Sequence, residues 1–123
     1  MKTILLIGGI YNIIIAIFHF GFWKLFNWRD DLKKLRFANR GILQILNIQL
    51  SFYFIFTAFL CFLYPDELLT SALGKAFLLG TAFFWVLRTM LQFIFFKVNH
   101  YLIHLLTITF LIGALLFLIP AFS

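Results

Sequence analysis

Four long apolar segments constrain what this chain can fold into more than any other feature of its sequence. They cover about residues 3 to 26, 41 to 64, 76 to 96 and 101 to 122. A helix needs about 20 mostly apolar residues to cross the hydrocarbon core of a bilayer, and the segments lack the two-residue alternation of a membrane β-barrel. The sequence therefore predicts an all-α membrane protein, a four-transmembrane-helix bundle that forms a single domain over residues 1–123.

The composition excludes an ordinary soluble domain. Hydrophobic residues make up 64% of the chain and charged residues only 11%, against about 25% charged residues in a typical soluble protein. A soluble domain of this size leaves too much surface exposed to hide so many apolar side chains. Cys61, the single cysteine, is interpreted as a small apolar residue within one of the predicted helices.

The beginning of the chain resembles a secretory signal, because Lys2 precedes an apolar run. That run continues to about residue 26, and no small-residue cleavage site closes it. We therefore interpret the first segment as a retained membrane helix.

A polar stretch at residues 27–40 separates the first two apolar segments. Asn27 is placed to cap a helix, Asp30 and Lys34 are spaced to pair on its surface, and Leu32 and Leu35 give it an apolar side. We expect a short amphipathic helix in the headgroup region, continuing from the first membrane helix. Pro65 is expected to end the second membrane helix.

Lysine and arginine near the helix ends predict the orientation. The first and third connections hold most of them: Lys24, Arg29, Lys33, Lys34, Arg36, Arg40 and Lys97. The opposite side has only Lys2 and Lys75. We therefore expect an integral protein of a bacterial inner membrane, with both termini outside and the 27–40 loop in the cytoplasm. The net charge of +6 is attributed to the membrane surface, and no nucleic-acid partner is expected.

Each predicted helix carries polar residues three, four or seven positions apart, so each set shares one face. The sets are Asn12 and His19; Arg40, Gln44, Asn47 and Ser51; Thr81, Trp85, Arg88 and Gln92; and His100, His104 and Thr107. Buried polar groups cost free energy unless they are hydrogen-bonded, so a bundle would turn these faces inward. With the predicted orientation, most of them lie in the cytoplasmic half of the membrane. The sequence thus predicts a polar pocket that faces the cytoplasm.

Arg88 is the sharpest signal in these faces. Burying an arginine in a membrane costs about 3 kcal/mol or more, and none of the four acidic residues lies in a predicted membrane segment. Its guanidinium is expected to reach the inner surface, to stack on Trp85, to bond to Gln44, Asn47 and Gln92, or to bind an anion from outside the chain. The predicted ligand-binding residues are Arg88, Gln44, Asn47, Gln92, His104, His19, Ser51, Trp85 and Thr107.

The function expected from this pattern is binding of an anionic amphiphile or lipid through Arg88. One alternative is a haem-binding redox protein with His19 and His104 as axial ligands and Arg88 on a propionate. Another is a structural or accessory subunit, in which the polar residues only join helices. A transporter or channel would require an oligomer, because four helices are too few for most carriers.

No cofactor, metal site or catalytic residue is predicted. The histidines lack an accompanying carboxylate or second cysteine, and no nucleophile–base pair is recognisable from spacing, so we do not expect an enzyme. The expected partners are membrane lipids and the amphiphilic ligand. The small residues Ala76 and Gly80, which are four positions apart, indicate either a close approach of helices within the chain or a contact in a homo-oligomer.

Overall fold

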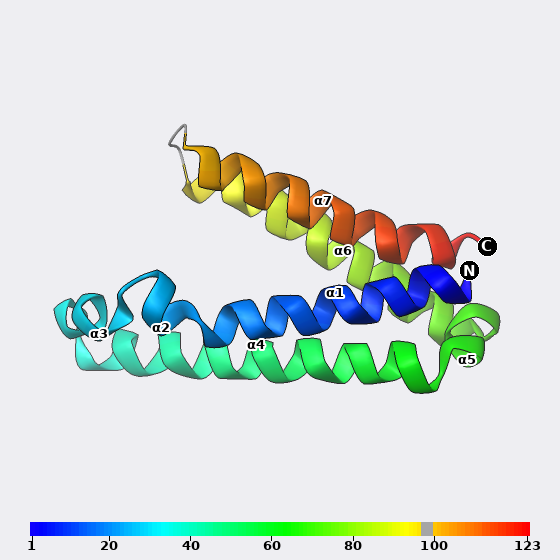
Figure 1. Ribbon diagram of the computed structural model, residues 1–123, viewed down its shortest axis with the longest axis horizontal. Coiled ribbons are helices and arrows are strands. Elements are labelled where there is room, and N and C mark those ends of the chain that lie inside the picture. Colours follow the sequence, from blue (N-terminus) through cyan, green and yellow to red (C-terminus); the bar gives the residue numbers. More distant parts are fainter. Residues whose placement is uncertain (97–99) are drawn as a thin grey trace. The chain divides into compact units, whose positions relative to one another are not determined.

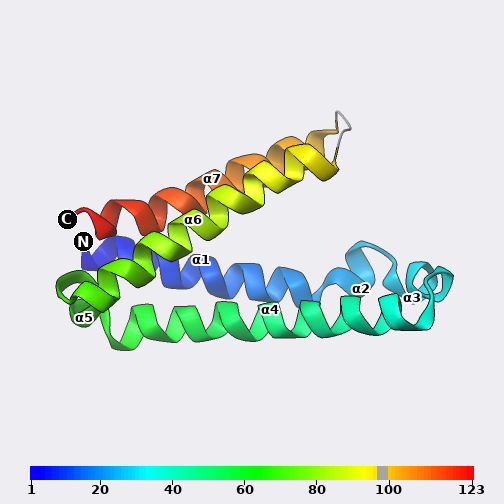
Figure 2. The same ribbon diagram turned by 180° about the vertical axis from the view of Figure 1, so that it is seen from behind.

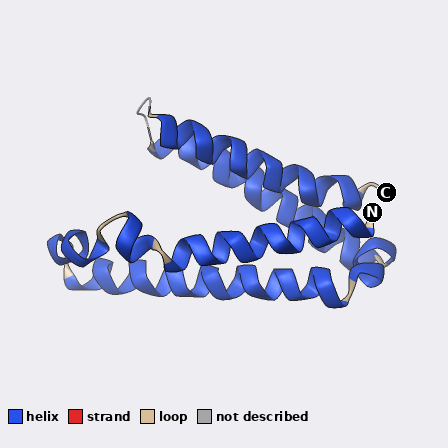
Figure 3. Cartoon of the chain, viewed as in Figure 1, coloured by secondary structure: helices blue, strands red, loops and turns tan. Residues whose placement is uncertain are grey.

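The computed structural model describes residues 1–96 and 100–123, and the secondary structure of this part is helical, without strands (Figures 1 and 3). Lys97, which contributed to the predicted orientation, lies outside the described residues. The elements are α1 (Lys2–Phe20), α2 (Phe22–Leu25), α3 (Trp28–Asp31), η1 (Leu32–Lys34), α4 (Phe37–Leu63), α5 (Pro65–Thr70), α6 (Ala72–Phe95) and α7 (Tyr101–Ala121).

Four of these helices, α1, α4, α6 and α7, are long and apolar enough to cross a membrane. Between 28% and 33% of the residues in their most apolar stretches are buried inside the protein. Most of the remaining side chains are exposed Ile, Leu and Phe, a surface that suits lipid rather than water. The predicted class, an all-α membrane protein with four membrane-crossing helices, is confirmed.

The chain forms two compact units. Unit 1 consists of residues 1–8 and 60–123, and unit 2 of residues 9–59. In unit 1, α6 and α7 lie side by side and run in opposite directions, as two opposed views show (Figures 1 and 2). Leu78, Trp85, Phe110 and Phe117 are among their buried side chains.

The short helix α5 packs closely on the start of α6. Ser71 caps α6, since its hydroxyl accepts a hydrogen bond from the Gly74 amide at 2.8 Å. A Cβ added to Gly74 would lie 2.5 Å from the Leu68 Cα and 2.7 Å from the Leu68 carbonyl oxygen. Glycine at this position is therefore what permits the two backbones to approach. Pro65 ends α4 as predicted and occupies the first turn of α5.

In unit 2, residues 9–20 of α1 lie beside α4. The Asn47 side chain joins the two helices, since its Nδ2 donates to the His19 carbonyl oxygen at 3.0 Å. Ile15 and Ala16 of α1 and Phe54 of α4 are buried. An interhelical hydrogen bond and the contact of the His19 ring with the Phe54 ring thus join this pair.

The connection between α1 and α4 differs from the expected continuous helix. The first apolar segment was predicted to be helical to about residue 26, but α1 ends at Phe20 and a new short helix follows Gly21. A short helix does follow Asn27 as predicted, although it continues as the 3₁₀ turn η1. Asn27 adopts a left-handed conformation (φ 53°) and its side chain makes no capping hydrogen bond. The ion pair predicted between Lys34 and Asp30 is replaced by one with Asp31, whose Oδ1 lies 3.8 Å from Lys34 Nζ.

Candidate functional site

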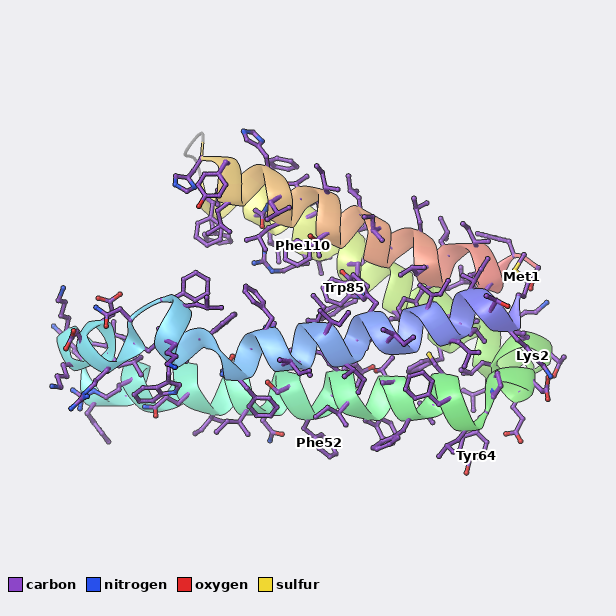
Figure 4. All side chains as sticks on the ribbon, in the orientation of Figure 1. Met1, Lys2, Phe52, Tyr64, Trp85 and Phe110 are labelled. Carbon is purple, nitrogen blue, oxygen red and sulfur yellow. The ribbon has the colours of Figure 1, made fainter. Side chains whose placement is uncertain are left out.

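The polar face of α6 is turned toward α7. Gln92 Nε2 donates to Thr107 Oγ1 at 2.7 Å and to the Ile103 carbonyl oxygen at 3.0 Å. One turn away, the Arg88 guanidinium carbon lies 4.6 Å from the centre of the Phe110 ring. The Trp85 ring stacks on the same Phe110, with 5.6 Å between ring centres and 19° between ring planes (Figure 4). We call these five residues, Trp85, Arg88, Gln92, Thr107 and Phe110, the Arg88 site.

Helical periodicity explains why these side chains meet. Trp85, Arg88 and Gln92 are three and four positions apart on α6, and Thr107 and Phe110 are three apart on α7. Because the helices run in opposite directions, the later residue of α6 meets the earlier residue of α7. The predicted shared face of Trp85, Arg88 and Gln92 is thus the face that contacts α7.

Arg88 is half-buried and has little protein support. Among the residues that the structure describes, no carboxylate lies within ion-pair distance of its guanidinium, and no protein oxygen accepts a hydrogen bond from it. The contact with Phe110 offsets part of the cost, because a cation over an aromatic ring contributes about 0.5 to 2 kcal/mol. The planar guanidinium thus has N–H donors that no oxygen of the described residues accepts.

Beside Arg88, Gln92 also has a polar atom without a hydrogen-bond partner among the described residues. The residue is 1% exposed, and its Oε1 accepts no hydrogen bond from the described part of the chain. Such a buried acceptor costs about 1 to 3 kcal/mol. Both hydrogen bonds from Nε2 are made to α7, so Oε1 is left as an acceptor one helical turn from Arg88.

The polar residues predicted to share one face of α7 have different surroundings. Thr107 belongs to the site, where it accepts from Gln92 and donates to the Ile103 carbonyl oxygen at 2.9 Å. His104 lies one turn earlier and is exposed. His100, also in the predicted stripe, accepts from the Leu102 amide at 3.1 Å and caps the start of α7.

Four predicted site residues, Gln44, Asn47, Ser51 and His19, lie in unit 2. Gln44 donates to the Arg40 carbonyl oxygen and Ser51 to the Asn47 carbonyl oxygen, both within α4. Asn47 bonds across to α1 and is buried, and its Oδ1 has no hydrogen-bond donor among the described residues. These contacts account for most of the polar atoms through helix structure and helix pairing. That these four residues and the Arg88 site line one pocket stays a prediction.

His19 is enclosed by aromatic rings within unit 2. Its Nδ1 lies 2.9 Å from the Ile15 carbonyl oxygen. The ring stacks on Phe22 at 4.6 Å between centres and meets the Phe54 ring edge-on at 5.2 Å. Its use as a haem ligand stays a prediction. Over residues 1–96 and 100–123, no three His, Cys, Asp or Glu side chains gather as a metal site would require.

Sequence reasoning missed one member of the Arg88 site. Phe110 supports both Trp85 and Arg88, yet it is one of 19 phenylalanines and nothing in its residue type singles it out. Its spacing of three positions from Thr107 is the signal that could have identified it.

Comparison with protein-family models, with curated proteins and with solved structures finds no match to this chain.

Proposed function

We propose that this integral membrane protein binds an anionic amphiphile, such as a lipid, at the Arg88 site. The observation that carries the proposal is the half-buried Arg88 guanidinium, which rests on Phe110 without a carboxylate or carbonyl acceptor among the described residues. A phosphate or carboxylate would supply the missing acceptor, and the forked geometry of arginine favours such groups in bidentate pairs.

The rest of the site suits the other parts of such a molecule. Gln92 Oε1 is a buried acceptor that a hydroxyl group of the ligand, or a water bound with it, would satisfy. The exposed faces of α6 and α7 carry large apolar side chains, among them Phe83, Leu87 and Ile108, which suit the hydrocarbon tail of an amphiphile. The proposal thus assigns the anionic head to Arg88 and the apolar tail to these exposed faces.

The proposal includes an orientation and a location. Six cations between residues 24 and 40 favour a cytoplasmic position for that connection, with both termini outside and the chain in a bacterial inner membrane. In that orientation the cytoplasmic leaflet is the nearer source of an anionic ligand for Arg88.

Native mass spectrometry of protein purified in mild detergent tests the proposal. We expect the wild-type protein to carry one additional mass more than Arg88→Gln. The matched control is Lys75→Gln, which removes a cation from the same helix near its other end and is expected to retain the mass. The value of the mass separates a lipid from a free phosphate or carboxylate.

Two results would overturn it. One is a bare protein mass for the wild type even after incubation with anionic phospholipid. The other is an equal additional mass on wild-type and Arg88→Gln protein, which would place the ligand away from Arg88.

A further inference from the structure

The segment from α2 through the first turn of α4, residues 22–40, carries a dense positive charge. Two acidic residues, Asp30 and Asp31, stand against six basic ones: Lys24, Arg29, Lys33, Lys34, Arg36 and Arg40. The segment directly follows one membrane-crossing helix and ends in the first turn of another. Its charge is therefore held beside the membrane rather than on a distant loop.

The segment has a folded base. The left-handed turn at Asn27 brings Trp28 back toward α2, so that the Trp28 ring meets the Phe22 ring at 5.4 Å between centres. Trp28 and Leu32 are buried, at 9% and 3% exposed. One side of the segment is thus packed against the protein.

Arg40 fastens the same segment to α4. Its Nε donates to the Leu32 carbonyl oxygen and its Nη2 to the Leu35 carbonyl oxygen, each at 3.0 Å. The Leu32 carbonyl oxygen also accepts from the Leu35 amide, which closes the 3₁₀ turn η1. Arg40 is consequently engaged in structure, whereas none of the other five cations donates to a backbone carbonyl among the described residues.

The other five cations are exposed, and among the described residues only Lys34 lies within ion-pair distance of an acid, with its Nζ 3.8 Å from Asp31 Oδ1. Three large apolar side chains are exposed beside them: Trp23, Leu25 and Phe37, the last at 88%. Outward cations together with exposed aromatic and aliphatic side chains are the features of a segment that lies among lipid headgroups. Clusters of four to eight basic residues next to a membrane helix attract anionic lipids.

We propose that residues 22–40 form a surface platform that binds the phosphate-bearing headgroups of anionic phospholipids, independently of the Arg88 site. Charge complementarity identifies the occupant: five exposed cations beside a bilayer meet the anionic phosphates of its headgroup layer. The fold contributes by holding the cations on a packed base, so that binding requires little further ordering of the backbone.

Quenching of tryptophan fluorescence by brominated lipids tests the platform. The full-length Trp85→Phe protein, which retains Trp23 and Trp28 within the platform, is reconstituted into phosphatidylcholine vesicles. Brominated phosphatidylglycerol or brominated phosphatidylcholine is then added in equal amounts. We expect the anionic lipid to associate about fivefold more strongly or better, since one surface cation contributes about that factor. The preference should fall as salt is raised.

The matched variants assign the preference to residues. Replacing the five exposed cations, Lys24, Arg29, Lys33, Lys34 and Arg36, by glutamine should reduce the preference to about one, the value for lipids that are not distinguished. Lys2→Gln with Lys75→Gln, which removes cations of unit 1, should leave it unchanged, and circular dichroism verifies that each variant is helical. Equal quenching by both lipids in the wild type, or no effect of salt, would overturn the platform. Loss of the preference in Arg88→Gln alone would assign it to the Arg88 site instead.

Discussion

The close packing of α5 on α6 can be tested by adding one methyl group, at Gly74. In Gly74→Ala the new methyl group would lie 2.5 Å from the Leu68 Cα and 2.7 Å from the Leu68 carbonyl oxygen. Both are backbone atoms, so no side-chain rotation relieves the contact and α5 must move. Overpacking of this kind costs about 1 to 3 kcal/mol. The gain in helix propensity from glycine to alanine, about 1 kcal/mol at most, offsets only part of it.

Gly80→Ala is the matched control on the same helix. A Cβ at Gly80 meets no described atom within 4 Å, so this variant gains the same propensity without a clash. We expect the free energy of unfolding of Gly74→Ala to be about 1 to 3 kcal/mol lower than that of Gly80→Ala. Unfolding in mixed micelles with increasing sodium dodecyl sulfate, followed by circular dichroism, measures both. Equal stabilities of the two variants would refute the close α5–α6 contact and with it the role assigned to Gly74.

Three further predictions concern polar contacts. Asn47→Ala should lower the free energy of unfolding by about 1 kcal/mol, because it removes the bond to α1, whereas Gln44→Ala, which loses a bond within its own helix, should change it by less than about 0.5 kcal/mol; a larger loss in the second variant would contradict this ranking, which the same unfolding assay measures. Arg40→Gln should speed hydrogen exchange of the amides of residues 32–36, since η1 loses its support, and unchanged exchange relative to an Arg36→Gln control would count against that support. Lys2→Gln should alter stability by no more than about 1 kcal/mol despite its 2.8 Å ion pair with Asp66, because both groups are well exposed; a greater change in the unfolding assay would show that this pair is unusually strong.

The fold class was predictable because length and apolar composition alone decide whether a helix can cross a membrane. The helix ends were less predictable. The starts of α4 and α6 were both predicted a few residues too late in the sequence, for the same reason. Residues around Lys75 and Arg40 were assigned to connections because they are charged, yet α6 begins at Ala72 and α4 at Phe37. Their side chains reach outward: Lys75 Nζ donates to the Ser123 carbonyl oxygen at 3.4 Å, and Arg40 bonds η1. A long side chain lets its backbone be helical while its charge lies elsewhere.

The break at Gly21 was missed because glycine within an apolar run does not by itself interrupt a membrane helix. The short helix α5 was missed because six residues are too few to show helical periodicity. For the site, spacing predicted that Arg88 and Gln92 share a face, but it does not say which face of which helix they meet. Only the three-dimensional pairing of α6 with α7 selects Phe110 and Thr107 as their contacts.

The assignment of the first eight residues to unit 1, apart from the rest of α1, has a consequence for the order of assembly during synthesis. Residues 9–59 are complete as a unit once α4 has been made, whereas Lys2 finds its ion-pair partner only when Asp66 has been translated. At about 5 to 20 residues per second, the interval between the synthesis of Lys2 and that of Asp66 is about 3 to 13 s. A Cβ added at Gly8 would lie 3.2 Å from the Phe117 ring, and Phe117 is translated after all of unit 2. Residues 1–8 therefore reach their final packing later than unit 2, and a fusion or tag attached to them is present throughout the time in which unit 1 closes.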